Sequence, residues 1–485
     1  MLRIALCFVL LLLMFVLLLA GAGDIARFIY PAGTVLLAVW FFVGQRKFYF
    51  DFVLWCWFLS PFLRRVIDYQ AGWKDPSLIL LAPYLVTMVA PLVGARRIAE
   101  GSRQESAPFV LALLAIACGV VLGLIQGSTS EMATPLVDWV VPILFALWLH
   151  STTDKDRADV FSSVERSFFA GVLVMGIYGV IQYVVAPAWD TNWLIQLSAN
   201  ADVNSMGTPE PYGIRVFSTL NSPGVFALVL ACGLLILVQS PRKLAPVAAI
   251  FGLVSLLLTL GRSAWLTLTV GLVLLLILMP RKVLRAVAVP GLAVFLAFSL
   301  ASLSPARDLV GDRFSSFIRL EEDASAGDRM NGALRAGQLL LSQPQGFGLG
   351  VAQDLIANDG SFSLNDNGFV DGFLALGLLP GILYFGCLAV LLVQSCRGLK
   401  QKPPEVRVAA VVAVAIAAQL PLDTVYLGPT GVLLWMFTTL ASKGEYSVSV
   451  HEVLVGSAPR PVSTGSPGIT GILGPGKETV ARLRQ

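Results

Sequence analysis

Three arginines stand in polar segments between long apolar runs, where their side chains could bind an anionic substrate. Arg215 precedes one apolar run, and Arg262 lies in the sequence TLGRSAW between two such runs. Arg329 opens a segment whose apolar residues recur at helical spacing. A guanidinium group can donate two hydrogen bonds to phosphate oxygens at once, so three converging arginines near a membrane surface would suit a diphosphate. Each arginine could equally extend to the membrane interface or pair with a loop carboxylate.

The composition is that of a polytopic membrane protein. Of the 485 residues, 56% are hydrophobic and 13% are charged, whereas soluble domains are about a quarter charged. The two histidines, His150 and His451, are too few to suggest a histidine-based metal site. The six cysteines lie in apolar segments or at their ends, so no disulfide framework is predicted. We expect no metal, no cofactor and no nucleic-acid partner, since nucleotide-binding fingerprints are also missing from the sequence.

The apolar segments predict an all-α polytopic membrane protein with about 14 transmembrane helices, within a range of 12–14. The first segment is longer than the apolar core of a signal peptide, so it is interpreted as a span. The third, Lys47 to Leu63, is short. The predicted spans begin near residues 4, 26, 48, 76, 107, 133, 167, 222, 244, 263, 283, 371, 406 and 424.

The distribution of lysine and arginine predicts which loops face the cytoplasm. With the N-terminus inside, the short cytoplasmic loops hold 17 of these residues and the short exterior loops hold 4. Cytoplasmic loops carry such an excess, so both termini are predicted to be cytoplasmic. The four basic residues of the short exterior loops are Arg64, Arg65, Lys74 and Arg262.

The same topology divides the chain into five predicted parts. An N-terminal transmembrane bundle is followed by core spans with a first exterior loop, a large exterior loop that contains an amphipathic helix, C-terminal spans, and a disordered cytoplasmic tail rich in Gly, Pro and Ser. In that order, the predicted boundaries are 1–186, 187–303, 304–370, 371–446 and 447–485.

The arginine segments resemble motifs of the O-antigen ligase and O-antigen polymerase superfamily. TLGRSAW is similar to its T-x-S-R-[SG]-[AG] hairpin, and RVFSTLNSP (215–223) to its R-x-x-G-T-F-x-x-P-N segment. DRMNGALRAGQLLLSQPQGFGLG (328–350) is similar to an Arg-led loop helix that ends in P-x-x-G-x-G. The succeeding NDNGFVDGFLALGLLPGILYF resembles an H-N-x-x-L segment and a glycine-containing span. The resemblance covers roughly residues 170–395.

The resemblance implies a metal-independent glycosyltransferase on the outer face of the bacterial cytoplasmic membrane, in exopolysaccharide or O-antigen biosynthesis. Its donor would be a polyprenyl-diphosphate-linked oligosaccharide. Its acceptor would be another lipid-linked glycan in a polymerase, or lipid A core in a ligase. Arg215, Arg262 and Arg329 would contact the diphosphate and stabilise the charge that grows as the sugar departs. A chain-length regulator and export proteins would be further partners.

Three departures from the family pattern bear on the chemistry. Gly261 stands where the family often has Ser, and the NSP of 221–223 replaces the usual P-N ending. Asp366 and Asn367 occupy the place of the ligase His-Asn. An aspartate could take the acceptor's proton in place of a histidine, and Asp366 is the first candidate, with Asp371 the second. Asp366 could instead be the N-cap of the following span. The substitution favours an exopolysaccharide polymerase over a ligase.

Four other polar and aromatic residues each have two possible roles. Asp138 and Asp423 lie in or beside apolar spans, where a carboxylate is either functional or a helix-packing contact. Trp189 and Trp193 could stack on sugars or belong to an interfacial aromatic belt. The rival class of protein is a transporter or a flippase of lipid-linked oligosaccharides. Such folds commonly consist of two related halves, and no similarity between halves is evident in this sequence.

Overall fold

The computed structural model describes residues 2–101, 103–127, 132–201, 206–302, 334–335, 337–351 and 367–443. Within these ranges the chain is helical, and the one extended pairing is an isolated antiparallel bridge between Gly207 and Ile214. Arg329, Asp366, most of the predicted exterior loop and the predicted tail lie outside the described residues.

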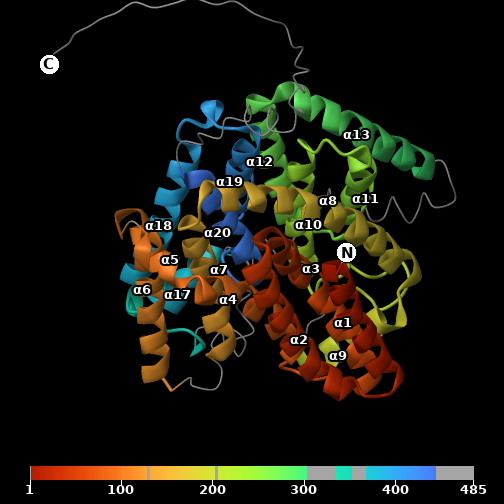
Figure 1. Cartoon of the computed structure of the whole chain (residues 1–485), viewed down its shortest axis with the longest axis horizontal. Helices are drawn as coiled ribbons and strands as arrows, with labels where there is room; N and C mark the ends of the chain where they lie inside the picture. Colours follow the sequence, from red (N-terminus) through yellow and green to blue (C-terminus); the bar gives the residue numbers. More distant parts are fainter. Residues whose placement is uncertain are drawn as a thin grey trace, which may run out of the picture. The chain divides into compact units, whose positions relative to one another are not determined.

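Most of the helices follow one another with short connections, and a longer described connection precedes α10 (Figure 1). In the first half of the chain they are α1 (Leu2–Leu19), α2 (Gly23–Gly44), α3 (Arg46–Ala71), η1 (Leu78–Leu81), α4 (Ala82–Val93), α5 (Ala95–Glu100), α6 (Arg103–Ile125), α7 (Ala133–His150), α8 (Asp154–Val185) and α9 (Ala188–Ala201). In the second half they are α10 (Pro223–Leu237), α11 (Ala245–Leu258), α12 (Arg262–Leu278), α13 (Pro280–Ser302), α17 (Gly368–Leu376), α18 (Leu378–Cys396), η4 (Leu399–Gln401), α19 (Pro404–Ala417) and α20 (Gly428–Ser442).

The all-α membrane architecture is confirmed. Within the described residues, five helices have the length and composition to cross a bilayer, and five shorter helices of 10–17 residues are also apolar. The five long helices do not confirm the fourteen predicted spans, and the third predicted span lies in a longer helix, since α3 has 26 residues. The apolar pattern missed its last two turns, where Arg64, Arg65 and Asp68 are charged but buried. Arg64 and Arg65 are therefore helix residues and not exposed loop cations.

Small residues allow the central helices to pack closely. Helix α8 lies beside α11, and a Cβ atom at Gly176 would lie 2.8 Å from the backbone of Phe251. Ser255 of α11 donates a hydrogen bond of 2.7 Å to the carbonyl oxygen of Gly176. Close backbone approach through small residues is typical of helix pairs in membranes. Lipid tails are as apolar as the side chains, so helices associate there through close packing and not through the hydrophobic effect. Helix α20 is buried around its circumference, as expected of a helix that is apolar on every face.

Ion pairs join loops that the charge distribution predicts on the cytoplasmic side. Asp156 forms ion pairs with Arg46 at 2.6 Å and with Arg97 at 2.7 Å. Arg242 pairs with Glu165 at 3.0 Å. We call the end of the protein formed by the connections after α2, α4, α7 and α10 the basic end. The structure thus groups these loops together, and which side of the membrane they face stays a prediction.

Candidate functional site

Arg215 and Arg262 come together from separate segments at the end opposite the basic end. The backbone of Arg215 donates to the carbonyl oxygen of Met206 at 3.0 Å, and its Nε donates to the carbonyl oxygen of Thr259 at 3.2 Å. Burial lowers the pKa of the Arg215 guanidinium, and the nearby positive charge of Arg262 lowers this pKa further. Two guanidinium groups held this near each other form a concentrated positive charge.

A tight turn between α11 and α12 presents Arg262. Leu260 has a φ of 57°, in the left-handed region, and the backbone N–H of Gly261 donates to the Thr259 hydroxyl at 3.0 Å. A Cβ atom at Gly261 would lie 3.1 Å from the Cβ of Ala227 on α10. Close packing against α10 therefore explains why glycine stands where the related family often has serine.

Below this turn, a buried glutamine connects α12 to the connection between α19 and α20. Gln419 Nε2 donates to Ser263 Oγ at 2.9 Å and to Asp423 Oδ2 at 3.0 Å, while its Oε1 accepts from the Thr267 hydroxyl at 2.8 Å. All three contacts use a single amide, so Gln419 holds the first turn of α12 against Asp423.

Asp371 belongs to the same polar network. Its Oδ2 accepts a hydrogen bond from the Thr424 hydroxyl, and the backbone N–H of Thr424 donates to Asp423 Oδ1 at 2.8 Å. Two carboxylates are thus linked through one residue, beside the turn that presents Arg262. We call Arg215, Arg262, Asp371, Asp423 and the bridging Gln419 and Thr424 the arginine–aspartate cluster.

The cap of α17 is Asn367. Its side-chain oxygen accepts from the backbone N–H groups of Phe369 at 3.1 Å and Val370 at 3.2 Å. The alternative that assigned this cap to Asp366 is therefore wrong. Asn367 places Asp371 one turn into the helix, where its carboxylate meets Thr424.

Glycines let the segment at 344–350 pack against α6 and α17. The backbone N–H of Phe347 donates to Leu374 of α17 at 2.8 Å, and that of Leu349 donates to Gly119 of α6 at 3.0 Å. Gly348 has a φ of 85°, and a Cβ atom there would overlap the backbone of Gly123. Gly346 and Gly348, which follow Pro344, therefore have a packing role beside the break between α17 and α18.

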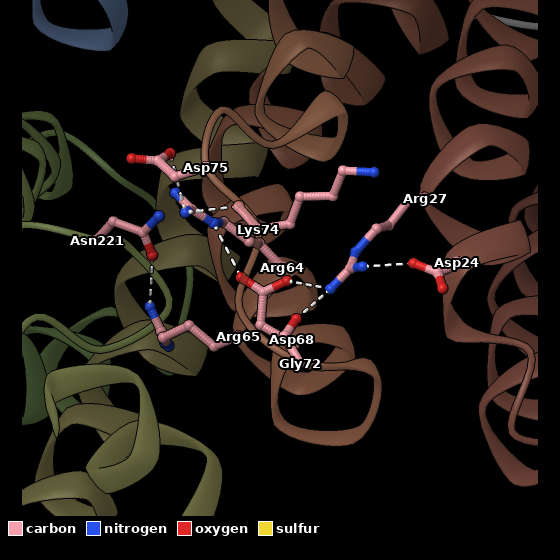
Figure 2. A network of polar contacts seen from close by, with 9 residues as sticks. All are labelled: Asp24, Arg27, Arg64, Arg65, Asp68, Gly72, Lys74, Asp75 and Asn221. Carbon is pink, nitrogen blue, oxygen red and sulfur yellow. Dashed lines mark hydrogen bonds and ion pairs between the residues drawn. The ribbon is translucent and has the colours of Figure 1, made fainter. Parts of the chain in front are cut away.

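A buried ion network, which the sequence did not reveal, supports the Arg215 segment (Figure 2). Arg65 pairs with Asp190 at 2.8 Å, and both side chains are fully buried. The same guanidinium donates to the carbonyl oxygens of Ser218 and Leu220, and to Asn221 Oδ1 at 3.0 Å. Arg65 thus fixes the backbone that follows Arg215. By composition alone, charged positions beside an apolar run predict a loop, so this role was not predictable from the sequence.

A second part of that network holds the end of α3. Asp68 forms ion pairs with Arg27 of α2 at 2.8 Å and with Arg64 at 3.2 Å. Arg64 also contacts Asp75 at 3.2 Å, and Arg27 contacts Asp24 at 2.6 Å, as Figure 2 shows. The two pairs of Asp68 are buried, whereas Asp24 and Asp75 are exposed. Together they connect α2, α3 and the following loop, so the network is structural.

Other candidate residues have packing roles. Trp193 is buried against Phe217, with ring centroids 5.3 Å apart, so it is available neither to a sugar nor to an interfacial belt. Trp189 donates from Nε1 to the Tyr178 hydroxyl at 2.7 Å. Asp138 of α7 accepts from the hydroxyl of Tyr84 on α4, which is a helix-packing contact. Among the described residues, no group of three or more His, Cys, Asp or Glu side chains could hold a metal ion.

The fold and this cluster define an integral membrane protein whose charged groups converge at one end of a helical bundle. Residues 82–422 match the model of a family described as WcaD colanic acid polymerase. The chain belongs to this family, and it is a membrane polymerase of exopolysaccharide repeat units, of the O-antigen polymerase and ligase type. This family match does not favour a ligase or a transporter. No curated protein matches the chain.

Proposed function

We propose that the polymerase uses the arginine–aspartate cluster to transfer an oligosaccharide from a polyprenyl-diphosphate donor to the hydroxyl group of a second lipid-linked glycan. The observation that supports this most is the contact of Arg215 with the turn that presents Arg262. The Nε atom of Arg215 donates to the carbonyl oxygen of Thr259 at 3.2 Å, and the positive charges of Arg215 and Arg262 repel each other. Such repulsion is relieved when an anion binds between the two groups. A diphosphate supplies that anion and accepts bidentate hydrogen bonds.

In the proposed reaction, the acceptor oxygen attacks the anomeric carbon of the donor sugar and gives its proton to a carboxylate. The bond between the anomeric carbon and the diphosphate oxygen breaks, and polyprenyl diphosphate leaves with the bonding electron pair. Arg215 and Arg262 stabilise the negative charge that develops on the leaving group, so a divalent ion is not required. Arg329 is the proposed third arginine.

Asp371 is the base that the described residues support. Its carboxylate is partly buried and is oriented by Thr424, and a positioned carboxylate near the reacting hydroxyl can act as a general base. Asp366, outside the described residues, remains the alternative proposed base.

An apolar cavity suits the lipid part of the donor. It has a volume of about 880 Å³ and is lined by α6, α18 and the segment that begins at Pro344. Leu114, Val121 and Leu379 are among its lining residues. An isoprenoid chain has no hydrogen-bonding groups, so an apolar wall beside the membrane is the surface that it requires.

The finer topology belongs to the same proposal. The site faces the outer side of the bacterial inner membrane and both termini are cytoplasmic, as the excess of basic residues in the predicted cytoplasmic loops indicates. About fourteen helices cross the bilayer. A chain-length regulator and export proteins act with the polymerase.

Purified protein with lipid-linked oligosaccharide tests the proposal. Wild-type protein lengthens the glycan without added divalent metal and with chelator present, whereas Arg262→Ala leaves single repeat units. Arg281→Ala, which removes a cation from the first turn of α13, serves as the matched control and retains activity. Lengthening that proceeds only with added lipid A core, or equal activity in the Arg262→Ala protein, contradicts the proposal.

A further inference from the structure

The basic end has an unbalanced positive charge around α10–α13. Between Glu210 and Asp308 the sequence contains no acidic residue. The connections after α10 and α12 and the first turns of α13 nevertheless hold five cations. They are Arg242, Lys243, Arg281, Lys282 and Arg285.

A cavity of about 360 Å³ lies among these four helices. Its walls are aliphatic and include Leu253 and Leu272. Its polar margin is formed by Arg242, Lys282 and Arg285, while Lys243 and Arg281 do not line it. Three of the five cations therefore surround one opening, and the other two lie close in sequence but outside it.

The net charge of this margin is positive. Arg242 is neutralised by Glu165, with two contacts of 3.0 and 3.1 Å. Lys282 and Arg285 are exposed, and in the described part of the chain no carboxylate lies within 4.0 Å of either. Two positive charges thus stay available for an anionic group.

The surroundings of the cavity are those of a lipid-facing surface. On α13, Leu284 is 64% exposed and Leu292 is 58% exposed. A cavity with aliphatic walls and a cationic margin suits a molecule that has a negatively charged head group and acyl chains. A soluble anion would leave the aliphatic walls uncovered.

We infer that this cavity binds an anionic phospholipid, with its phosphate between Lys282 and Arg285 and an acyl chain along α11 and α12. The site lies at the basic end, away from the arginine–aspartate cluster. It is therefore separate from the donor site and does not depend on the proposed catalytic roles.

Native mass spectrometry of the purified full-length protein, with phosphatidylglycerol or phosphatidylcholine added, tests the inference. The Lys282→Gln/Arg285→Gln double variant removes two charges from the margin. The Lys243→Gln/Arg281→Gln variant removes two charges near the cavity and is the matched control. Each cation near an anionic lipid contributes about 1 kcal/mol, so the first variant should bind phosphatidylglycerol about 30-fold more weakly.

A third variant, Ala249→Trp, tests the cavity without a change of charge. Ala249 lines the wall, so an indole there should displace the acyl chain and weaken phosphatidylglycerol binding, while size-exclusion chromatography checks that the protein remains folded. Equal weakening in the control double variant, or no preference of the wild type for phosphatidylglycerol over phosphatidylcholine, overturns the inference. Preferential binding of a polyprenyl phosphate in competition with phosphatidylglycerol overturns it as well.

Discussion

Arg65 and Asp190 should be strongly coupled in stability. The pair is fully buried with a separation of 2.8 Å, and Asp190 also accepts from Tyr178 and Gln182 at 2.8 Å each. Asp190→Leu leaves the Arg65 charge buried without its carboxylate, which costs about 3–5 kcal/mol. In an Arg65→Met background the same change leaves no buried charge. The cost of Asp190→Leu should therefore fall by about 2–3 kcal/mol, which is the coupling energy of the pair.

The assay is the free energy of unfolding in mixed micelles, measured for the wild type, both single variants and the double variant. Arg96→Ala is the control, because the Arg96–Glu100 pair is on the surface with Arg96 90% exposed, and its loss should leave stability unchanged within error. The double variant should also fail to lengthen glycans. Without the Arg65 guanidinium, the carbonyl oxygens of Ser218 and Leu220 lose the hydrogen bonds that it donates, and the backbone that follows Arg215 is held less firmly.

Two results would refute this reasoning. An equal cost of Asp190→Leu in both backgrounds would show that the two charges do not depend on each other. Full polymerase activity in the double variant would show that the anchoring of the segment after Arg215 does not position the site.

The remaining predictions concern the cluster and one glycine. Arg262→Ala should reduce the rate of glycan lengthening by about 10²–10³ with stability nearly unchanged, as for the loss of a group that stabilises transition-state charge; a rate near that of the wild type argues against the role. Asp371→Asn should reduce the rate by about 10²–10⁴ because an amide cannot accept the proton. A normal rate in this variant would show that another carboxylate is the base. Gly348→Ala should destabilise the protein by more than about 1 kcal/mol, since its φ is 85° and the new Cβ overlaps Gly123. Gly386→Ala, in a helix with open space around the glycine, is its control, and equal unfolding free energies for the two would contradict the proposed packing of the 344–350 segment.

The helical segments were predictable because a membrane span is a local property of composition. A run of about 20 apolar residues requires a helix whatever its neighbours, since lipid offers no partners to the backbone. The predicted starts near 133, 222, 244 and 424 fall close to the observed starts of α7, α10, α11 and α20. Charge bias likewise groups the loops without reference to packing, and the contacts of Asp156 with Arg46 and Arg97 agree with that grouping.

Only the tertiary structure showed what individual polar residues contact. Arg65 looked like a loop cation because sequence reading treats charge as exposed, yet its partner Asp190 is 125 residues away and both are buried. Gln419 was not predictable from its local sequence, because its role arises from contacts with Ser263 and Thr267 of α12, more than 150 residues away.

Sequence by itself determined that this chain is a polytopic membrane protein, and its arginine motifs pointed to a family that the match over residues 82–422 confirms. The tertiary structure decided that Arg215 contacts the turn that presents Arg262, that Asp371 and Asp423 share Thr424, and that Asn367 caps α17. The physical reason is range. Hydrophobicity acts residue by residue along the chain, whereas a polar cluster depends on the directions and distances of side chains brought together from remote segments.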